Sequence, residues 1–196
     1  MSSKTVLRWV SFITGAVALA LLIVIVFLPD TTAIGSGGTA SVVLSEQTLS
    51  ELPLRLTIPA IKVDAAVLPV GLTADGTMDT PKEPADVAWF DQGPRPGENG
   101  TAVIAGHFGW KNDIPAVFDD LNALQAGDKI FVENDKGAVV TFVVRALRLY
   151  GEKEDSSSVF GSSDGKAHLN LITCEGVWDK VSKSYSKRLV VFTDKE

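Results

Sequence analysis

A single cysteine, Cys174, ends the apolar run "HLNLITC" at residues 168–174. A thiol becomes a nucleophile when a base or a cation helps to ionise it, and acyl transfer also needs donors for the developing oxyanion. Because the chain has no second cysteine, Cys174 forms no intramolecular disulfide. It is therefore either a small buried hydrophobic residue or a thiol kept for its reactivity, and the residues that can reach it decide between the two.

Two histidines are the candidate bases for this thiol. On an extended strand, His168 and Cys174 share a face but lie about 20 Å apart, at about 3.3 Å per residue. His168 therefore cannot reach the thiol, and we expect it at the surface, at the edge of a loop. His107 ends a different apolar run, "TAVIAGH", and side chains of strand-borne sites gather at strand ends. His107 is the base that this geometry leaves available, and a purely structural histidine is the alternative.

Arg188 is the candidate third partner, because it begins the apolar run "RLVVF" that follows Cys174. If the two runs form an antiparallel pair, the loop 175–187 returns Arg188 to the side of Cys174. A guanidinium group is always charged and presents several donors, so it is suited to hold a substrate carbonyl or its oxyanion. A surface arginine that caps a strand is the alternative.

The elements that would position these residues are mostly short strands. From Pro53 onward the chain has short, β-branched runs of period two, and "NDKG" at 134–137 predicts a hairpin turn. One helix is predicted over "DIPAVFDDLNAL" at 113–124, with Asp113 as its cap and Pro115 in its first turn. Many short strands with one helix predict a compact β-barrel or sandwich. The predicted strands are "LRLTI", "IKVDA", "TAVIAGH", "DKIFVEN", "AVVTFVVRALRLY", "HLNLITC" and "RLVVF".

The N-terminal part has a different composition from the rest. Residues 10–28 carry no charge and, at about 1.5 Å per residue, span a hydrocarbon core of ~30 Å. Lys4 and Arg8 precede this run, which predicts a cytoplasmic N-terminus (1–9), a transmembrane anchor (10–28) and an exported remainder. Residues 29–52, with "GSGG", predict a flexible tether to a domain at 53–196. A cleaved signal peptide is the alternative to the anchor.

The charge pattern excludes nucleic acid and offers one candidate cation site. The net charge is −6 and no basic stripe with interleaved aromatic residues occurs, so no nucleic-acid partner is expected. The loop 151–167 contains Glu152, Glu154, Asp155 and Asp164, which are oxygen ligands suited to a cation such as calcium. A solvated loop without an ion is the default, and no metal or cofactor is expected to be required.

The runs "AVIAGH", "LNLITC" and "RLVVF", in that order, resemble those of the sortases, the membrane-anchored cysteine transpeptidases of bacterial surfaces. The resemblance extends over Pro53–Phe192 and is nearest to the class F branch. It implies a closed eight-stranded β-barrel with one or two short helices. It assigns Cys174 as the nucleophile, His107 as acid and base, and Arg188 as the group that stabilises the oxyanion. Supporting roles fall to Thr173 and to the backbone N–H of Glu175.

The resemblance also implies a reaction and its partners. A sortase cleaves a sorting signal of the L-P-x-T-G kind near the C-terminus of a secreted protein, and passes the acyl group to an amine of the cell wall or of another protein. The loops 151–167 and 176–187 would select the substrate. Two alternatives stay open from the residues alone: a cysteine peptidase that only hydrolyses, and an anchored β-barrel binding module in which Cys174 is inert.

Overall fold

The computed structural model describes residues 51–151 and 153–196. The predicted cytoplasmic segment 1–9, the predicted anchor 10–28 and nearly all of the predicted tether 29–52 lie outside these residues. Within the part that is described, no helix is long and apolar enough to cross a membrane.

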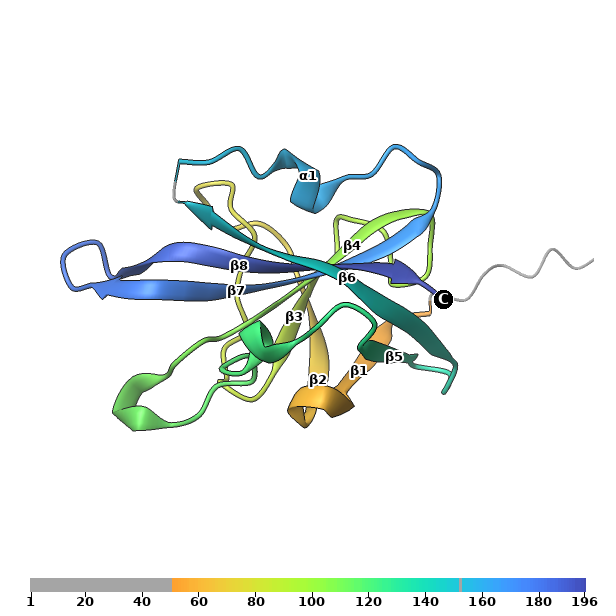
Figure 1. Ribbon diagram of the computed structural model, residues 1–196, viewed down its shortest axis with the longest axis horizontal. Helices are drawn as coiled ribbons and strands as arrows, with labels where there is room; N and C mark the ends of the chain where they lie inside the picture. The colour runs from red at the N-terminus through yellow and green to blue at the C-terminus, as the bar shows by residue number, and fades with distance from the viewer. Residues whose placement is uncertain (1–50, 152) are drawn as a thin grey trace, which may run out of the picture. The chain divides into compact units, whose positions relative to one another are not determined.

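The described residues form eight strands that close into a barrel in the order β1-β2-β3-β4-β7-β8-β6-β5 (Figure 1). The predicted mostly-β, closed eight-stranded architecture is therefore confirmed. The short turn η1 (Pro59–Ile61) lies between β1 and β2, and the hairpin predicted at 134–137 joins β5 to β6. The strands are β1 (Pro53–Ile58), β2 (Val63–Val70), β3 (Val87–Phe90), β4 (Gly100–Gly106), β5 (Lys129–Asn134), β6 (Val139–Gly151), β7 (Ala167–Asp179) and β8 (Ser184–Lys195).

The pairing of β4 with β7 determines where the candidate residues lie. These two strands run parallel, with Thr101 opposite His168 and Ala105 opposite Ile172. On its other side β7 pairs antiparallel with β8. The C-terminal end of β4 and the middle of β7 therefore meet at one rim of the barrel, although they are far apart in the sequence.

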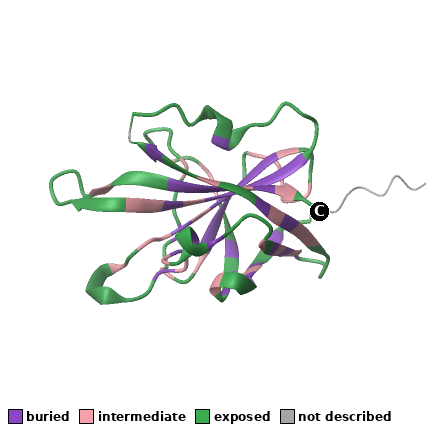
Figure 2. Ribbon diagram, in the orientation of Figure 1, coloured by how far each residue is buried: buried purple, intermediate pink, exposed green. Residues whose placement is uncertain are grey.

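Buried residues gather on the strands in the middle of the barrel (Figure 2). Successive side chains of a strand point to opposite faces, so one set from each strand fills the core. Its largest fully buried side chains include Leu56 of β1, Ile104 of β4 and Phe142 of β6. Each such side chain contributes roughly 1.5–3 kcal/mol when it is removed from water. The core therefore fixes which face of β4 and β7 points inward, and with it the direction of the site residues on both strands.

The helix predicted over 113–124 is wrong: the segment contains only the 3₁₀ turns η2 (Lys111–Asp113) and η3 (Leu121–Ala123). Inside the segment, Ile114 precedes Pro115 and is extended, with φ of −71° and ψ of 129°, so the chain does not begin a helix after Asp113. The carboxylate of Asp119 accepts hydrogen bonds from the N–H groups of Gly109 and Ala116, which tightens the connection into turns. Three apolar residues of the segment, Phe118, Leu121 and Leu124, are nevertheless buried in the core, whereas Ile114 is exposed.

The strands that carry Cys174 and Arg188 are longer than predicted. Cys174 was expected to end its strand and Arg188 to begin the next, with a loop at 175–187 between them. Instead β7 continues to Asp179 and β8 already begins at Ser184, so most of that loop is a two-stranded ribbon (Figure 1). A bulge between Glu175 and Trp178 interrupts the pairing. Gly176 fits this bulge because its φ is 89° and an added Cβ would meet the hydroxyl of Ser186 at 2.6 Å.

His168 is also placed differently from the prediction of an exposed loop edge. It lies within β7, its side chain is 9% exposed, and its ring bridges two carboxylates. Nδ1 lies 2.9 Å from Asp194 and Nε2 lies 3.0 Å from Asp164. Burial lowers the pKa of this imidazole, but the bonds to Asp164 and Asp194 raise it, and the net pKa is raised above its ordinary value. His168 therefore joins the start of β7 to the end of β8 at the rim away from Cys174.

Replacing His168 with glutamine is expected to lower the free energy of unfolding most at acidic pH. A raised pKa in the folded state means that protonation favours folding below the unfolded pKa, and that this stabilisation fades as the pH rises through the folded pKa. We expect a loss of about 1–2 kcal/mol at about pH 5.5 and a smaller loss at about pH 8.5. Urea denaturation at both pH values measures it, and an equal loss at both would show that the imidazole is neutral in the folded protein.

Candidate active site

Cys174 and Arg188 face each other across the β7–β8 ribbon. The two residues are direct partners in the antiparallel register, as the sequence predicted. Opposite residues on one face of such a pair have Cβ atoms about 4.5–5.5 Å apart. The thiol is half-buried, and the guanidinium is exposed. The structure therefore brings together a nucleophile and a cation that are separated by a hairpin in the sequence.

Arg188 is held by its own hairpin. Its Nη1 donates to the carbonyls of Tyr185 and Lys187, at 3.0 and 2.9 Å, and its Nη2 donates to the hydroxyl of Ser184 at 3.2 Å. These three contacts direct the guanidinium along β8. A guanidinium has five N–H donors, so further donors remain for a ligand above Cys174.

The surroundings of Cys174 keep its thiol mostly protonated at neutral pH. Burial raises the pKa of the thiol above its ordinary value, and the positive charge of Arg188 lowers it by less. Arg188 alone therefore does not generate a thiolate. A nucleophilic reaction at Cys174 requires a base that takes the proton as the sulfur attacks.

His107 follows the last residue of β4 and lies at the same rim as Cys174. Continued by two residues beyond Ala105 and Ile172, the parallel register places His107 opposite Cys174. Its imidazole, however, is turned toward the loop before β3: Nε2 lies 2.7 Å from the carbonyl oxygen of Pro81, and the ring packs on Trp110 with centroids 4.5 Å apart. Because a carbonyl only accepts, Nε2 carries the proton, and in the neutral ring Nδ1 holds the free lone pair.

Thr173 and Glu175, the predicted supporting residues, flank the thiol. The hydroxyl of Thr173 is buried and donates to the carbonyl of Gly106 at 2.8 Å, so it joins β7 to the end of β4 just before His107. Glu175 turns its carboxylate to the N–H of Gly176, at 3.3 Å. Thr173 therefore holds β7, which carries Cys174, against the end of β4, which His107 follows. The role of the Glu175 N–H stays a prediction.

A pocket of about 780 Å³ opens above the thiol. Cys174 and Arg188 lie in its lining, and His107 does not. Its walls are largely apolar and come from two loops. The connection from β6 to β7, which the resemblance to sortases assigned to substrate selection, contributes Phe160. The loop after β2 contributes Leu72 and Met78, and nothing in the sequence had pointed to it. Phe160 meets Phe90 of β3 edge to face, with centroids 6.0 Å apart. Such a pocket fits an apolar peptide side chain beside a reactive thiol.

The connection 151–167 is a wall of this pocket rather than a solvated loop. It contains the short helix α1 (Ser157–Phe160), whose Val159 is buried against Tyr150 and Val190. No spacing in the sequence marks this helix, because only one of its four residues is buried. Its position over the thiol results from contacts with β6 and β8 that are distant along the chain.

The acidic residues of the same connection serve its local structure. Glu154 pairs with Arg148 and accepts from the N–H of Gly151, Asp155 accepts from the N–H of Ser157, and Asp164 binds His168. Glu152 lies outside the described residues. Across the described ranges, no group of three His, Cys, Asp or Glu side chains is arranged to hold a metal ion.

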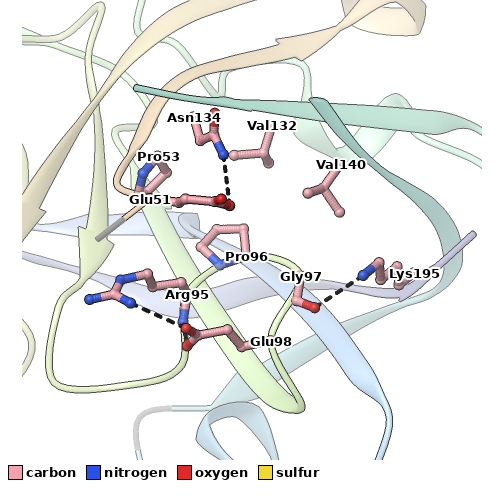
Figure 3. Close-up of a pocket in the computed structure, with 10 residues that line it drawn as sticks. All are labelled: Glu51, Pro53, Arg95, Pro96, Gly97, Glu98, Val132, Asn134, Val140 and Lys195. Atoms are coloured by element: carbon pink, nitrogen blue, oxygen red, sulfur yellow. Dashed lines mark hydrogen bonds and ion pairs between the residues drawn. The ribbon is translucent and has the colours of Figure 1, made fainter. Parts of the chain in front are cut away.

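A second pocket, of about 270 Å³, lies where the described chain enters the barrel (Figure 3). Its polar groups contact one another: Asn134 donates to Glu51 at 3.0 Å, and Lys195 donates to the carbonyl of Gly97 at 3.1 Å. Neither a cysteine nor a histidine lines it. It therefore lacks a thiol and an imidazole, whereas the thiol of the chain lies in the Cys174 pocket.

Comparisons with known proteins identify the family and the fold of this domain. The family model described as Sortase domain matches residues 56–196. Among solved structures, sortase C-1 from Actinomyces oris is similar at 24% identity, with a TM-score of 0.58 and 72% of each chain covered. Sortase A from Corynebacterium diphtheriae is similar at 21% identity and a TM-score of 0.57, over 75% of this chain and 61% of that one. No curated protein sequence matches the chain.

Proposed function

We propose, since this chain belongs to the sortase family of cysteine transpeptidases, that it cleaves a sorting signal of the L-P-x-T-G type and transfers the acyl group to an amine. The observation that carries the proposal is the register of β7 and β8, which sets Cys174 opposite Arg188 in the lining of a largely apolar pocket. The substrate is a secreted protein with a C-terminal sorting signal. The acceptor is an amine of the cell wall or of another protein.

The reaction begins with the transfer of the thiol proton. The imidazole of His107 takes the proton at its free Nδ1, and Sγ of Cys174 attacks the carbonyl carbon of the substrate threonine. The raised pKa of the thiol makes this coupled transfer necessary, since little thiolate exists beforehand. To reach the sulfur, the imidazole must break its hydrogen bond to the carbonyl of Pro81, or rotate while it keeps that bond. The close approach of β4 and β7 at Thr173 supports this pairing.

The remaining steps return the enzyme to its starting state. Arg188 donates to the carbonyl oxygen while it carries negative charge. The C–N bond after threonine breaks, the leaving amine takes the proton from the imidazolium, and a thioester remains on Cys174. An incoming amine then attacks this thioester, gives its proton to His107, and the released sulfur regains a proton. Hydrolysis by water in place of the amine would make the protein a peptidase.

The cellular setting is part of the proposal. We place the protein in a bacterial cell membrane by a single anchor at 10–28, with the N-terminus in the cytoplasm and the catalytic domain 53–196 outside. The class F-like branch stays a prediction, since the similar solved structures named above are of classes C and A and show the fold alone at their low identity.

Mass spectrometry of residues 53–196 with L-P-x-T-G-type peptides and a panel of amines tests the reaction. A thioacyl adduct on Cys174 that an added amine converts into a new amide would support the transpeptidase. An adduct released only by water would favour the hydrolytic alternative. If neither peptides nor iodoacetamide modify Cys174 in the folded protein, the thiol is inert and the binding module is the better reading.

Replacing Arg188 with methionine is expected to lower kcat/KM for transpeptidation on the order of 10²–10³-fold, as the loss of an oxyanion donor does. The same change removes the positive charge that lowers the pKa of Cys174, so iodoacetamide should alkylate the thiol more slowly at neutral pH. Arg55→Met is the control, because Arg55 pairs with Asp64 between β1 and β2. A loss below tenfold with an unchanged alkylation rate would make Arg188 a surface residue.

A further inference from the structure

The β7–β8 ribbon beyond Cys174 exposes apolar side chains. Residues 176–187, here called the lysine hairpin, contain Val177, Trp178 and Val181, whose exposed fractions are 76%, 47% and 92%. Isolated exposed apolar residues are ordinary on a protein surface, but three within five positions at a projecting tip are not. No strand pairs with this tip apart from the two that form it, within the described residues.

The same hairpin is positively charged on an acidic protein. Lys180, Lys183 and Lys187 face only one acid within the hairpin, Asp179, whereas the whole chain carries a net charge of −6. Asp179 is engaged in the turn itself, since its carboxylate accepts from the N–H of Val181 at 2.7 Å. Lys180 and Lys183 therefore place positive charge at the apolar tip, whereas Lys187 lies at the base of the hairpin, in the lining of the Cys174 pocket.

Aromatic contacts hold this tip in a fixed arrangement. Trp178 and Tyr185 are direct partners across the ribbon, and their rings meet at 5.1 Å. On its other side, Tyr185 meets Phe108 at 5.4 Å, in the loop that follows β4. The hairpin is thus braced against the segment next to His107, and it presents its apolar side chains on a preformed support.

We propose that the lysine hairpin docks on an anionic lipid surface. Tryptophan and tyrosine rings favour the interface between lipid and water, and lysines near it are attracted by anionic headgroups. The apolar groups stand on a projecting turn and not in a groove, so they suit insertion among headgroups better than capture of a peptide. The hairpin spans about seven residues from Cys174 to its tip, which would hold the thiol ~20 Å from the surface.

Site-specific fluorescence in the full chain tests the docking. With Cys174→Ala as background, Val181→Cys gives a single labelling site at the tip. Val139→Cys is the matched control, because Val139 is 55% exposed and begins β6. The hairpin lies at the other end of β6, where Gly151 pairs with Lys187. Each labelled protein is mixed with vesicles of phosphatidylcholine alone, or of phosphatidylcholine with phosphatidylglycerol. The vesicles are collected by flotation, and quenching of the label by brominated lipids in the bilayer is measured.

The label at 181 should be quenched in phosphatidylglycerol vesicles, and the label at 139 should not. Lys180→Gln with Lys183→Gln should lower the equilibrium constant for docking about 25-fold, because each lysine near an anionic surface contributes about fivefold. Lys62→Gln with Lys136→Gln removes the same charge elsewhere and should have no effect. Flotation of the full chain reports the anchor proposed at 10–28 as well, so the docked fraction is read from the quenching of the label at 181. The proposal fails if that label is not quenched in phosphatidylglycerol vesicles, or if both labels are quenched alike. It also fails if the label at 181 is quenched equally with and without phosphatidylglycerol. A last contrary result would be that the lysine substitutions change the turnover of soluble peptides but not this quenching.

Discussion

Replacing Cys174 with alanine is expected to abolish acyl transfer, with a loss on the order of 10⁴–10⁶-fold in kcat. The half-buried thiol is the only sulfhydryl in the chain, so no neighbouring thiol can take over the attack. The fold should persist, because a half-buried thiol contributes about 1 kcal/mol or less to stability. Peptide cleavage and amine transfer are measured by chromatography, and folding by thermal denaturation of the same samples.

Cys174→Ser distinguishes the nucleophile from its surroundings. The hydroxyl keeps the size and position of the side chain, but it is a far weaker nucleophile than a thiol at neutral pH. We expect the serine variant to bind sorting peptides and to transfer almost none. Turnover within tenfold of the parent enzyme in Cys174→Ala would exclude the thioester mechanism altogether.

Replacing His107 with glutamine is expected to lower kcat on the order of 10²–10⁴-fold, the usual contribution of a general acid and base. A glutamine amide can still donate to the carbonyl of Pro81, which His107 contacts at 2.7 Å, so the loop before β3 should keep its position. The change therefore removes proton transfer and preserves the local contact. Single-turnover measurements of acylation and of amine transfer should both be slowed, because the imidazole serves both steps.

His168→Gln is the matched control for this change. It replaces the other histidine of the chain, at the far end of β7 from Cys174, and should lower stability without slowing turnover of the folded fraction. If His107→Gln retains more than a tenth of the parent rate, His107 is a structural residue. Another base would then have to accept the proton from Cys174.

The positions of the reactive residues were largely predictable, because they depend on short-range patterns. Alternating apolar residues mark the strands of Cys174 and Arg188, and the short segment between them makes antiparallel pairing the simplest connection. The approach of His107 depends on the parallel pairing of β4 and β7, which are separated by two strands and a helix along the chain. The resemblance to sortases indicated that approach, whereas periodicity alone did not.

The failures of prediction come from interactions that are distant or unusual for the residue type. His168 is buried because it bonds Asp194, which lies 26 residues later and carries no local signal. The segment 113–124 has a helical apolar pattern, but Ile114 before Pro115 is extended and the chain continues as turns. The orientation of the His107 ring toward Pro81 is likewise a contact across 26 residues. Hydrophobic patterns depend on residues that are close in the sequence, so they do not predict such distant contacts.

The closed barrel also limits how a peptide can be recognised. Within the described residues, every strand of the ring is bonded to a neighbour on each side, and β1 closes it by pairing with β5. An open sheet binds an extended peptide as one more strand, through main-chain hydrogen bonds that do not depend on the side chains of the peptide. The ring itself has no free edge for this, and within the described residues the β7–β8 ribbon that continues past Ile172 keeps unpaired outer edges. Recognition inside the ring therefore depends on side chains held in the pocket. Such an enzyme should reject most unfolded polypeptides and select by the shape of a few residues.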